Sequence, residues 1–350
     1  MTEGDRQAAA RRFLVGQGLH AEDERSRWTP LTGGVSSDLW RVELPGRTLC
    51  VKAALPRLRV ADEWFAPVGR NAVEYEWLTF AQEHVPGSCP RVLAHDAEAG
   101  FFAMEYLPPQ HHRLWKAALL AGDVDPAFAG RVGDVVGRLH KASAADASVE
   151  QRFATDANFD VLRITPYLRV SAERNPDVAD RLHELADRLA GTRLALVHGD
   201  LSPKNILIHP TTAILLDAEC AWFGDPAFDL AFCLTHLLLK TRVRPDRAAP
   251  LREAAERLLA AHRSHLDWEP PHRFDERVAA LLPALLLARV DGSSPVEYLT
   301  APGDRSAVRE AALRLLDDRP GRTADVLDRG AAALAGACGT RPVTPGAPPG

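Results

Sequence analysis

Five short hydrophobic runs in the first third of the chain, each bounded by polar or turn residues, predict β-strands. They cover residues 28–31, 39–44, 49–51, 91–95 and 101–107. Between the third and fourth runs, residues 71–83 carry apolar side chains at helical spacing. We therefore expect an N-terminal unit of about five strands with one helix after the third. A short amphipathic helix at residues 5–20 is expected to precede it.

Beyond Pro108 and Pro109 the pattern changes to longer helices. They are predicted at about 125–146, 174–190, 226–240, 249–265, 275–290 and 305–318. Three short apolar runs lie between the second and third of these helices. The pattern divides the chain into a helical extension (1–27), a β-rich region (28–107), a mostly helical region (108–335) and a disordered tail (336–350).

The composition narrows the function classes. The 350 residues are 46% hydrophobic, and a net charge of −5 favours neither nucleic-acid nor membrane-surface binding. The N-terminus lacks the apolar core of a signal peptide, so we expect a cytoplasmic protein. Five scattered cysteines, never in Cys-x-x-Cys spacing, argue against a disulfide framework or a zinc site.

One local basic group follows the predicted helix at 226–240. Its members are Lys240, Arg242, Arg244 and Arg247. Because cations are favoured at the C-terminal ends of helices, we expect this group to be a solvated helix end or loop.

Residues 198–207, with the sequence His-Gly-Asp-Leu-Ser-Pro-Lys-Asn-Ile-Leu, have the layout of a phosphotransferase catalytic loop. Asp200 and Asn205 stand five positions apart between two apolar runs, and a third run ends in Asp217. Kinases need one carboxylate to orient and deprotonate the attacking hydroxyl, and oxygen ligands to hold Mg²⁺ against the phosphates. We assign the first role to Asp200 and the second to Asn205 and Asp217. A plain turn would explain His-Gly-Asp alone, but not the full spacing.

The β-rich region offers candidates for nucleotide binding. Gly34, Ser36 and Ser37 lie in a small-residue turn whose backbone N–H groups could approach phosphates, although a hairpin turn explains the same residues. Lys52 ends the third predicted strand and is one of only five lysines, against 37 arginines. A lysine there can pair with the α- and β-phosphates, held by a carboxylate from the next helix.

Two glutamates could hold that lysine. We prefer Glu76, which stands fourteen residues before Pro90, a spacing associated with small-molecule kinases, and keep Glu74 as the alternative. Further along, the backbone of Glu105, Tyr106 and Leu107 is expected to meet the adenine edge. An edge strand leading into a linker describes the same residues without a ligand.

These residues resemble the aminoglycoside phosphotransferase and choline kinase superfamily. The resemblance rests on His198–Leu201, Asn205, Asp217, the segment 225–231 and the pair 139–140, and covers about residues 28–290. It implies an α+β, bilobal protein-kinase-like fold with a small β-rich N-lobe and a larger, mostly helical C-lobe. It also implies ATP and Mg²⁺ as cofactors, and Asp229 as a carboxylate that braces the catalytic loop.

A narrower likeness is to 5-methylthioribose kinase. It rests on residues 51–60, the insert containing Trp64, and the triplet from Asp217 to Glu219. That family has an Asp-x-Glu metal motif, so the resemblance implies Glu219 as a second metal-facing acid. It also implies Arg289 near the substrate, although this chain has one arginine where that family has two. Residues 202–205, Ser-Pro-Lys-Asn, follow the broader superfamily instead.

The sequence therefore predicts an ATP- and Mg²⁺-dependent kinase acting on a hydroxyl of a sugar-like small molecule, with no nucleic-acid or membrane partner. An aminoglycoside or other antibiotic O-phosphotransferase is the alternative acceptor class. A nucleotide-binding pseudokinase is a further alternative, although Lys52, Asp200, Asn205 and Asp217 are all present. A metalloenzyme built on His111–His112 or on His262 and His265 is weaker, because no third ligand is evident.

Overall fold

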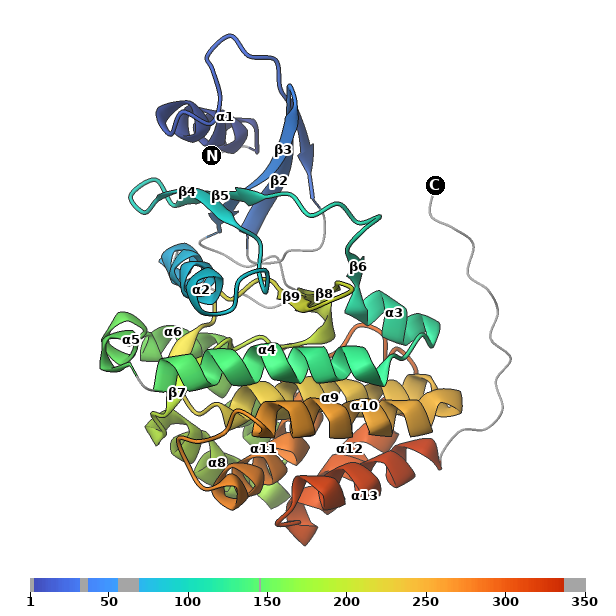
Figure 1. Cartoon of the computed structure of the whole chain (residues 1–350). Helices are drawn as coiled ribbons and strands as arrows, with labels where there is room; N and C mark the ends of the chain where they lie inside the picture. The colour runs from blue at the N-terminus through green and yellow to red at the C-terminus, as the bar shows by residue number, and fades with distance from the viewer. Residues whose placement is uncertain (1–2, 32–36, 56–68, 145, 337–350) are drawn as a thin grey trace.

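The computed structural model describes residues 3–31, 37–55, 69–144 and 146–336 (Figure 1). It contains a β-rich N-terminal part and a larger, mostly helical C-terminal part, which confirms the predicted fold class. The boundaries at residues 28, 108 and 336 stay predictions. Within the described residues, no helix has the length and apolar character needed to cross a membrane.

The N-terminal part is built on one antiparallel five-stranded sheet with the order β1-β2-β3-β5-β4. Its strands are β1 (Arg27–Pro30), β2 (Ser37–Leu44), β3 (Arg47–Ala54), β4 (Val92–Asp96) and β5 (Phe101–Glu105). Helix α2 (Arg70–His84) follows β3, as the periodicity predicted. All five predicted strands and the interposed helix are therefore present.

The two faces of this sheet are covered by different helices. Helix α1 (Glu3–Gly16) packs Phe13 against Phe101 with ring centroids 5.7 Å apart, on the face that carries Trp40 and Val42. On the other face, Trp77 of α2 belongs to the main core of the molecule. Burying each such large side chain contributes about 1.5–3 kcal/mol, so α2 is held firmly under β3.

The C-terminal part is a stack of helices around α9 (Figure 1). Its longer helices are α4 (Pro126–Ala144), α8 (Ala179–Gly191), α9 (Ala227–Val243), α10 (Ala248–Arg263), α11 (Pro271–Asp291), α12 (Pro302–Asp318) and α13 (Thr323–Ala335). Residues 227–241 of α9 are all buried, which is the pattern of a helix surrounded by others. Any polar side chain in that stretch therefore faces protein rather than bulk water.

Among the described residues, ten short helices and strands lie between residues 113 and 224, in the segments that connect the longer elements. They are β6 (Arg113–Leu114), α3 (Trp115–Ala121), α5 (Ala147–Arg152), α6 (Asp156–Phe159), a π-helix (Asp160–Arg169), α7 (Val170–Arg174), β7 (Ala195–Val197), β8 (Ile206–Ile208), β9 (Ala213–Leu215) and β10 (Trp222–Gly224). Three 3₁₀ turns, Pro176–Val178, Pro203–Asn205 and Pro245–Arg247, complete the set.

The structure adds the short helices α3, α5, α6 and α7 to the predicted ones, and it departs from the prediction in three longer segments. The helix expected at 174–190 starts only at Ala179, because Pro176 opens a 3₁₀ turn and cannot donate an intrahelical hydrogen bond. The π-helix at Asp160–Arg169 contains Pro166, which hides its periodicity. Helix α13 was not predicted, although Val326, Leu327 and Leu334 are buried on it.

Candidate active site

The predicted catalytic loop connects β7 to β8. Gly199 has a φ of +76°, and a Cβ atom there would lie 2.4 Å from the carbonyl oxygen of Cys220. A side chain at this position would therefore strain the backbone and collide with the turn that carries Cys220. The glycine lets the chain turn sharply enough to direct the next residue, Asp200, out of the sheet.

Asp229, at the start of α9, braces this loop. Its carboxylate accepts hydrogen bonds from the backbone N–H of His198 at 2.7 Å and of Gly199 at 2.9 Å. The same carboxylate lies 3.2 Å from Nε2 of His140 on α4, whose Nδ1 is 3.0 Å from His262. The bracing role expected for Asp229 is thus confirmed, and His262 is occupied within this network.

Asp200 lies between two cations. Its Oδ2 is 2.7 Å from Nζ of Lys204 and 3.1 Å from a guanidinium nitrogen of Arg163. Burial would raise the pKa of Asp200, but Lys204 and Arg163 outweigh it and hold the pKa below its ordinary value. The carboxylate is therefore ionised at neutral pH, as a group that accepts a hydroxyl hydrogen bond must be.

Arg163 is a site residue that was not predicted from the sequence. Its Nε donates to the carbonyl of Gly199 at 2.5 Å, so it holds the loop backbone as well as the Asp200 carboxylate. It lies in the π-helix, a stretch for which no element was predicted. No local sequence signal distinguishes Arg163 from the many surface arginines. Lys204, by contrast, lay inside the motif but had been given no role.

His198 joins the catalytic loop to the segment that carries Asp217. Its Nε2 donates to the carbonyl of Leu216 at 3.1 Å, and its Nδ1 accepts from the N–H of Asp200 at 3.2 Å. Burial lowers the pKa of His198, so the ring is neutral and can donate at one nitrogen while accepting at the other. This hydrogen-bond pattern assigns the tautomer.

Asp217 and Lys52 meet at the end of β9. The Nζ of Lys52 is 2.6 Å from Oδ1 of Asp217 and 2.6 Å from Oε2 of Glu74 on α2. Burial alone would lower the pKa of Lys52, but the charges of Asp217 and Glu74 raise it, so the ammonium form persists. Asp217 has a φ of +65°, which is rare for a non-glycine residue. Residues with such backbone conformations cluster at functional sites.

The lysine partner is Glu74, and the preference for Glu76 was wrong. Glu76 lies 40% exposed and pairs with Arg152 at 3.3 Å. The physical reason is helical phase, because Glu74 precedes the buried Trp77 and Leu78 by three and four residues. Glu74 therefore shares their inward face, whereas Glu76 points towards solvent.

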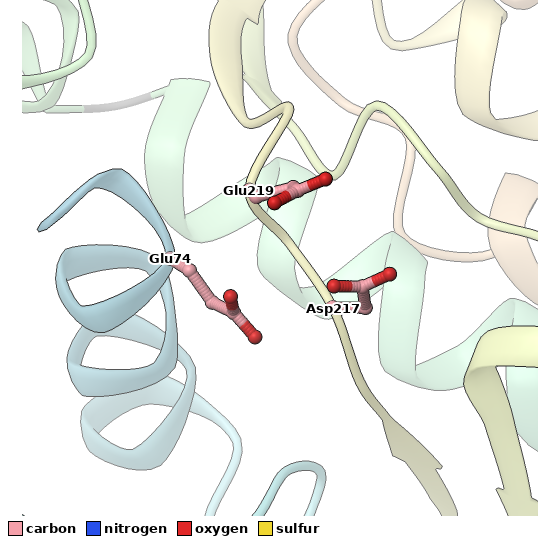
Figure 2. A group of neighbouring side chains, drawn as sticks. All are labelled: Glu74, Asp217 and Glu219. Carbon is pink, nitrogen blue, oxygen red and sulfur yellow. The ribbon is translucent and has the colours of Figure 1, made fainter. Parts of the chain in front are cut away.

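Three carboxylates converge around this lysine. Oxygen atoms of Glu74, Asp217 and Glu219 all lie within 4.8 Å of one another, and Figure 2 shows Glu74 on α2 facing the segment that carries the two others. Arg70 on α2 donates to Glu219 at 3.1 Å. An oxygen-only donor set suits Mg²⁺, which binds carboxylate and amide oxygens and keeps several waters.

Asn205 lies where the catalytic loop meets β9. Its Nδ2 donates to the carbonyl of Asp200 at 3.0 Å, and its own carbonyl accepts from the N–H of Leu216 at 2.9 Å. These bonds bring Asn205 next to the segment that ends in Asp217. The assignment of Asn205, Asp217 and Glu219 as metal ligands stays a prediction.

The predicted nucleotide-binding residues divide into two groups. Gly34 and Ser36 lie outside the described residues, as do residues 56–60 and the insert that contains Trp64. Ser37 is buried and begins β2. Glu105 ends β5, where its N–H donates to the carbonyl of Arg91 at 2.9 Å.

Tyr106 and Leu107 follow Glu105 and lead out of the sheet. The guanidinium of Arg41 lies 5.0 Å from the ring centre of Tyr106. This segment is where the chain leaves the β-rich part for the helical part, the position expected of the adenine edge. Adenine contacts by Glu105, Tyr106 and Leu107 stay a prediction.

Arg289, on α11, lies on the helical side of the catalytic loop. Its Nη1 is 2.8 Å from the hydroxyl of Tyr167, and its guanidinium lies 5.5 Å from that ring centre. The guanidinium of Arg163 is 5.6 Å from the same ring. Tyr167 therefore links the side chain that holds Asp200 to Arg289. Contact of Arg289 with a substrate stays a prediction.

Comparison with known proteins points in the same direction as this geometry. Residues 27–268 match the model of the family described as "Phosphotransferase enzyme family". The methylthioribose kinase of Escherichia coli O45:K1 is 31% identical over 235 residues, which cover 58% of this chain and 55% of that protein. The methylthioribose kinase of Yersinia enterocolitica is 28% identical over 253 residues, covering 64% and 62%. The chain thus spans little more than half the length of these curated relatives.

Solved structures share the fold at low identity. A choline/ethanolamine kinase family protein from Mesorhizobium loti superposes with a TM-score of 0.53 and 17% identity, covering 95% of this chain and 99% of that one. At this identity the likeness establishes the protein-kinase-like fold alone.

Proposed function

The chain belongs to the phosphotransferase enzyme family, and we propose that it is an ATP- and Mg²⁺-dependent kinase whose acceptor is a hydroxyl group of a sugar-like small molecule. The observation that carries this proposal is the Asp200 carboxylate, held by Arg163 and Lys204 on the braced loop. Beside it stands the Lys52–Asp217 pair, in the arrangement that phosphoryl transfer requires.

In this proposal Asp200 positions the acceptor. One carboxylate oxygen, Oδ2, is engaged by Lys204 and Arg163, which leaves Oδ1 to accept a hydrogen bond from the attacking hydroxyl. Asp200 then takes up that proton as the new O–P bond forms and the bond from the γ-phosphorus to the bridging oxygen breaks, so that ADP leaves. General-base assistance of this kind is typically worth about 10²–10⁴ in rate.

The nucleotide is bound on the other side of the loop. Lys52 neutralises the α- and β-phosphates, while Asn205, Asp217 and Glu219 would hold Mg²⁺, which offsets charge on the phosphate oxygens when bound. Glu74 fixes Lys52 in place. Gly34, Ser36 and Ser37 would cover the phosphates, and Glu105, Tyr106 and Leu107 would meet the adenine.

The acceptor class follows from charge. Arg289 and Arg163 flank Tyr167 next to Asp200, so the acceptor side of the loop is cationic. A polycationic aminoglycoside would be repelled there, whereas hydroxyl-rich neutral or anionic molecules are tolerated. The likeness to methylthioribose kinases supports a sugar-like acceptor in the same way.

A screen for ADP release tests the proposal. The chain would be incubated with Mg·ATP and separate pools of sugars, amino alcohols and aminoglycosides, with Asp200→Asn as the matched control. We expect acceptor-dependent ADP release in the sugar pool that Asp200→Asn abolishes. Release only in the aminoglycoside pool would support the antibiotic kinase instead, and nucleotide binding without release in any pool would support a pseudokinase.

A further inference from the structure

A second charged group lies on the helical side of the catalytic loop. We call it the basic cluster and define it as Lys116, His236, Lys240, Arg289 and Tyr298. His236 and Lys240 stand one turn apart on α9, Lys116 lies on α3, Arg289 on α11, and Tyr298 in the segment after α11. Burial is the main cause that lowers the pKa of His236, and the positive charges of Arg289, Lys240 and Lys116 lower it further. Four separate parts of the chain thus contribute residues that act on His236 or Lys240.

Among the described residues, only one of the three cations of this cluster, Lys116, pairs with a carboxylate. Lys240 is fully buried, and its Nζ lies 3.5 Å from the ring centre of Tyr298. In the part of the chain that the structure describes, no carboxylate forms an ion pair with Lys240 or Arg289. Lys116 pairs with Glu297, which is 65% exposed. The expectation that Lys240 is solvated was therefore wrong.

The same cluster holds polar atoms without partners. Nε2 of His236, Nε of Arg289 and the hydroxyl of Tyr298 are buried and form no hydrogen bond with the described residues. His236 and Arg289 are themselves only 6% and 7% exposed. Leaving such groups unsatisfied costs free energy, so their persistence together points to a bound partner that supplies acceptors.

The cluster is close to the reacting carboxylate. Arg163 forms an ion pair with Asp200, and its guanidinium lies over the ring of Tyr167. The hydroxyl of Tyr167 in turn accepts a hydrogen bond from Arg289. One aromatic ring therefore separates the catalytic loop from the cluster. An acceptor of sugar size could present a hydroxyl to Asp200 and its far end to Arg289.

We propose that the basic cluster binds an anionic group of the acceptor, a carboxylate or a phosphate monoester, during phosphoryl transfer. This proposal rests on the proposed kinase function and narrows its acceptor to sugar acids or sugar phosphates. Lys240 and Arg289 supply the charge, and His236 and Tyr298 supply polar atoms that fix the orientation. The neutral sugar of the methylthioribose kinases would leave Lys240 without a counter-charge.

Three ligands with the same five-carbon chain test this proposal: ribitol, ribonate and ribitol 5-phosphate. Binding to the full chain would be measured by titration calorimetry at constant ionic strength, with and without Mg·ADP. ADP release with Mg·ATP would be measured for the same three. We expect ribonate, ribitol 5-phosphate or both to bind at least about tenfold more tightly than ribitol, as charge-assisted hydrogen bonds imply.

Three variants localise the effect. Lys240→Met should remove most of the preference for the anion, and Tyr298→Phe should reduce it about threefold without leaving a cavity. Lys141→Met is the matched control, because it removes one positive charge from an exposed lysine that pairs with Asp267. Thermal unfolding of each variant reports whether it is folded, and Tyr298→Phe decides the outcome should Lys240→Met fail to fold.

The outcomes separate the two proposals. Tighter anion binding that depends on Lys240 and Tyr298 supports the cluster, even if no ligand releases ADP, in which case the kinase assignment fails alone. Equal binding of ribitol and the anions, or a preference unchanged in Lys240→Met and Tyr298→Phe, overturns the cluster. ADP release with ribitol that is insensitive to Lys240→Met would leave the kinase intact and contradict the anionic acceptor.

Discussion

The two charged groups on either side of the catalytic loop are built in opposite ways. Around Lys52, three carboxylates (Glu74, Asp217 and Glu219) face two cations, Lys52 and Arg70, among the described residues. In the basic cluster, Lys116, Lys240 and Arg289 face one exposed carboxylate, Glu297.

This difference indicates which kind of ion each group can bind. The first group has its cations held by short ion pairs and an excess of carboxylate oxygens, so it can accept a further cation such as Mg²⁺. The second has two buried basic side chains, Lys240 and Arg289, that form no ion pair with the described residues, and it has unpartnered polar atoms, so it can accept an anion. Asp200, between Lys204 and Arg163, lies between the two.

Removing the Asp200 carboxylate should have the largest effect. Asp200→Ala should leave ATP affinity nearly unchanged but lower turnover by at least about 10², because only the acceptor hydroxyl loses its base. Steady-state ADP release and nucleotide titration measure the two quantities. Turnover that survives the substitution would show that another group is the base.

Removing the carboxylate of Asp217 should weaken Mg²⁺ binding. Asp217→Ala removes one predicted ligand and the partner of Lys52, so the Mg²⁺ concentration for half-maximal activity should rise by about tenfold or more. A titration with Mg²⁺ at fixed ATP measures this. An unchanged Mg²⁺ dependence would remove Asp217 from the ligand set.

Replacing each glutamate of α2 by glutamine in turn should show that the buried Glu74 matters for ATP binding and the exposed Glu76 does not. Glu74→Gln weakens the clamp on Lys52 and should lower kcat/KM for ATP by about tenfold, the effect of losing one buried charge-assisted hydrogen bond. Glu76→Gln removes the same charge two residues away and should change it less than twofold. The reverse order of effects would favour the original spacing argument over helical phase.

Replacing Lys240 should produce the smallest effect, which is a change in the stability of the fold with pH. Burial, reinforced by the charge of Lys116, lowers the pKa of Lys240 from 10.5 to about 7, while Glu297 opposes and Arg289 adds to the shift. The unfolded chain therefore binds one more proton than the folded chain between about pH 7 and 10.5, so stability rises with pH across this window.

Lys240→Met removes that penalty. Without ligand it should unfold at a temperature about 3 °C or more above the wild type at pH 7, and the difference should shrink towards pH 10. Scanning calorimetry at several pH values measures this, with Lys141→Met as the exposed control. A difference that is the same at pH 7 and pH 10 would mean that Lys240 keeps its proton throughout.

Many features of the fold and the site could be predicted from hydrophobic periodicity and motif spacing within short stretches of the sequence. The five strands, α2 and the loop residues Asp200, Asn205 and Asp217 follow from short-range alternation and spacing. The fold class came from the resemblance that these motifs carry. The helical phase of Glu74, which shares the face of Trp77 and Leu78, also distinguishes it from Glu76, whereas the spacing from Glu76 to Pro90 does not report which side chain faces Lys52.

Other features had no local signal. Arg163 lies in a π-helix interrupted by Pro166, where the 3.6-residue period does not apply. The basic cluster combines positions 116, 236, 240, 289 and 298 from four separate elements or segments, and only packing brings them together. Lys240 was expected in solvent because it stands at the C-terminal end of a predicted helix, whereas the burial of α9 on all sides depends on its packing with other helices.

The central claim is that Asp200 directs the γ-phosphate of ATP onto an acceptor hydroxyl. Phosphorus-31 NMR of the wild type with Mg·ATP and a reactive acceptor from the screen tests it most directly. We predict a new phosphomonoester signal that grows in step with ADP and is absent with Asp200→Asn. Growth of inorganic phosphate alone, or an equal phosphomonoester signal with Asp200→Asn, would contradict it.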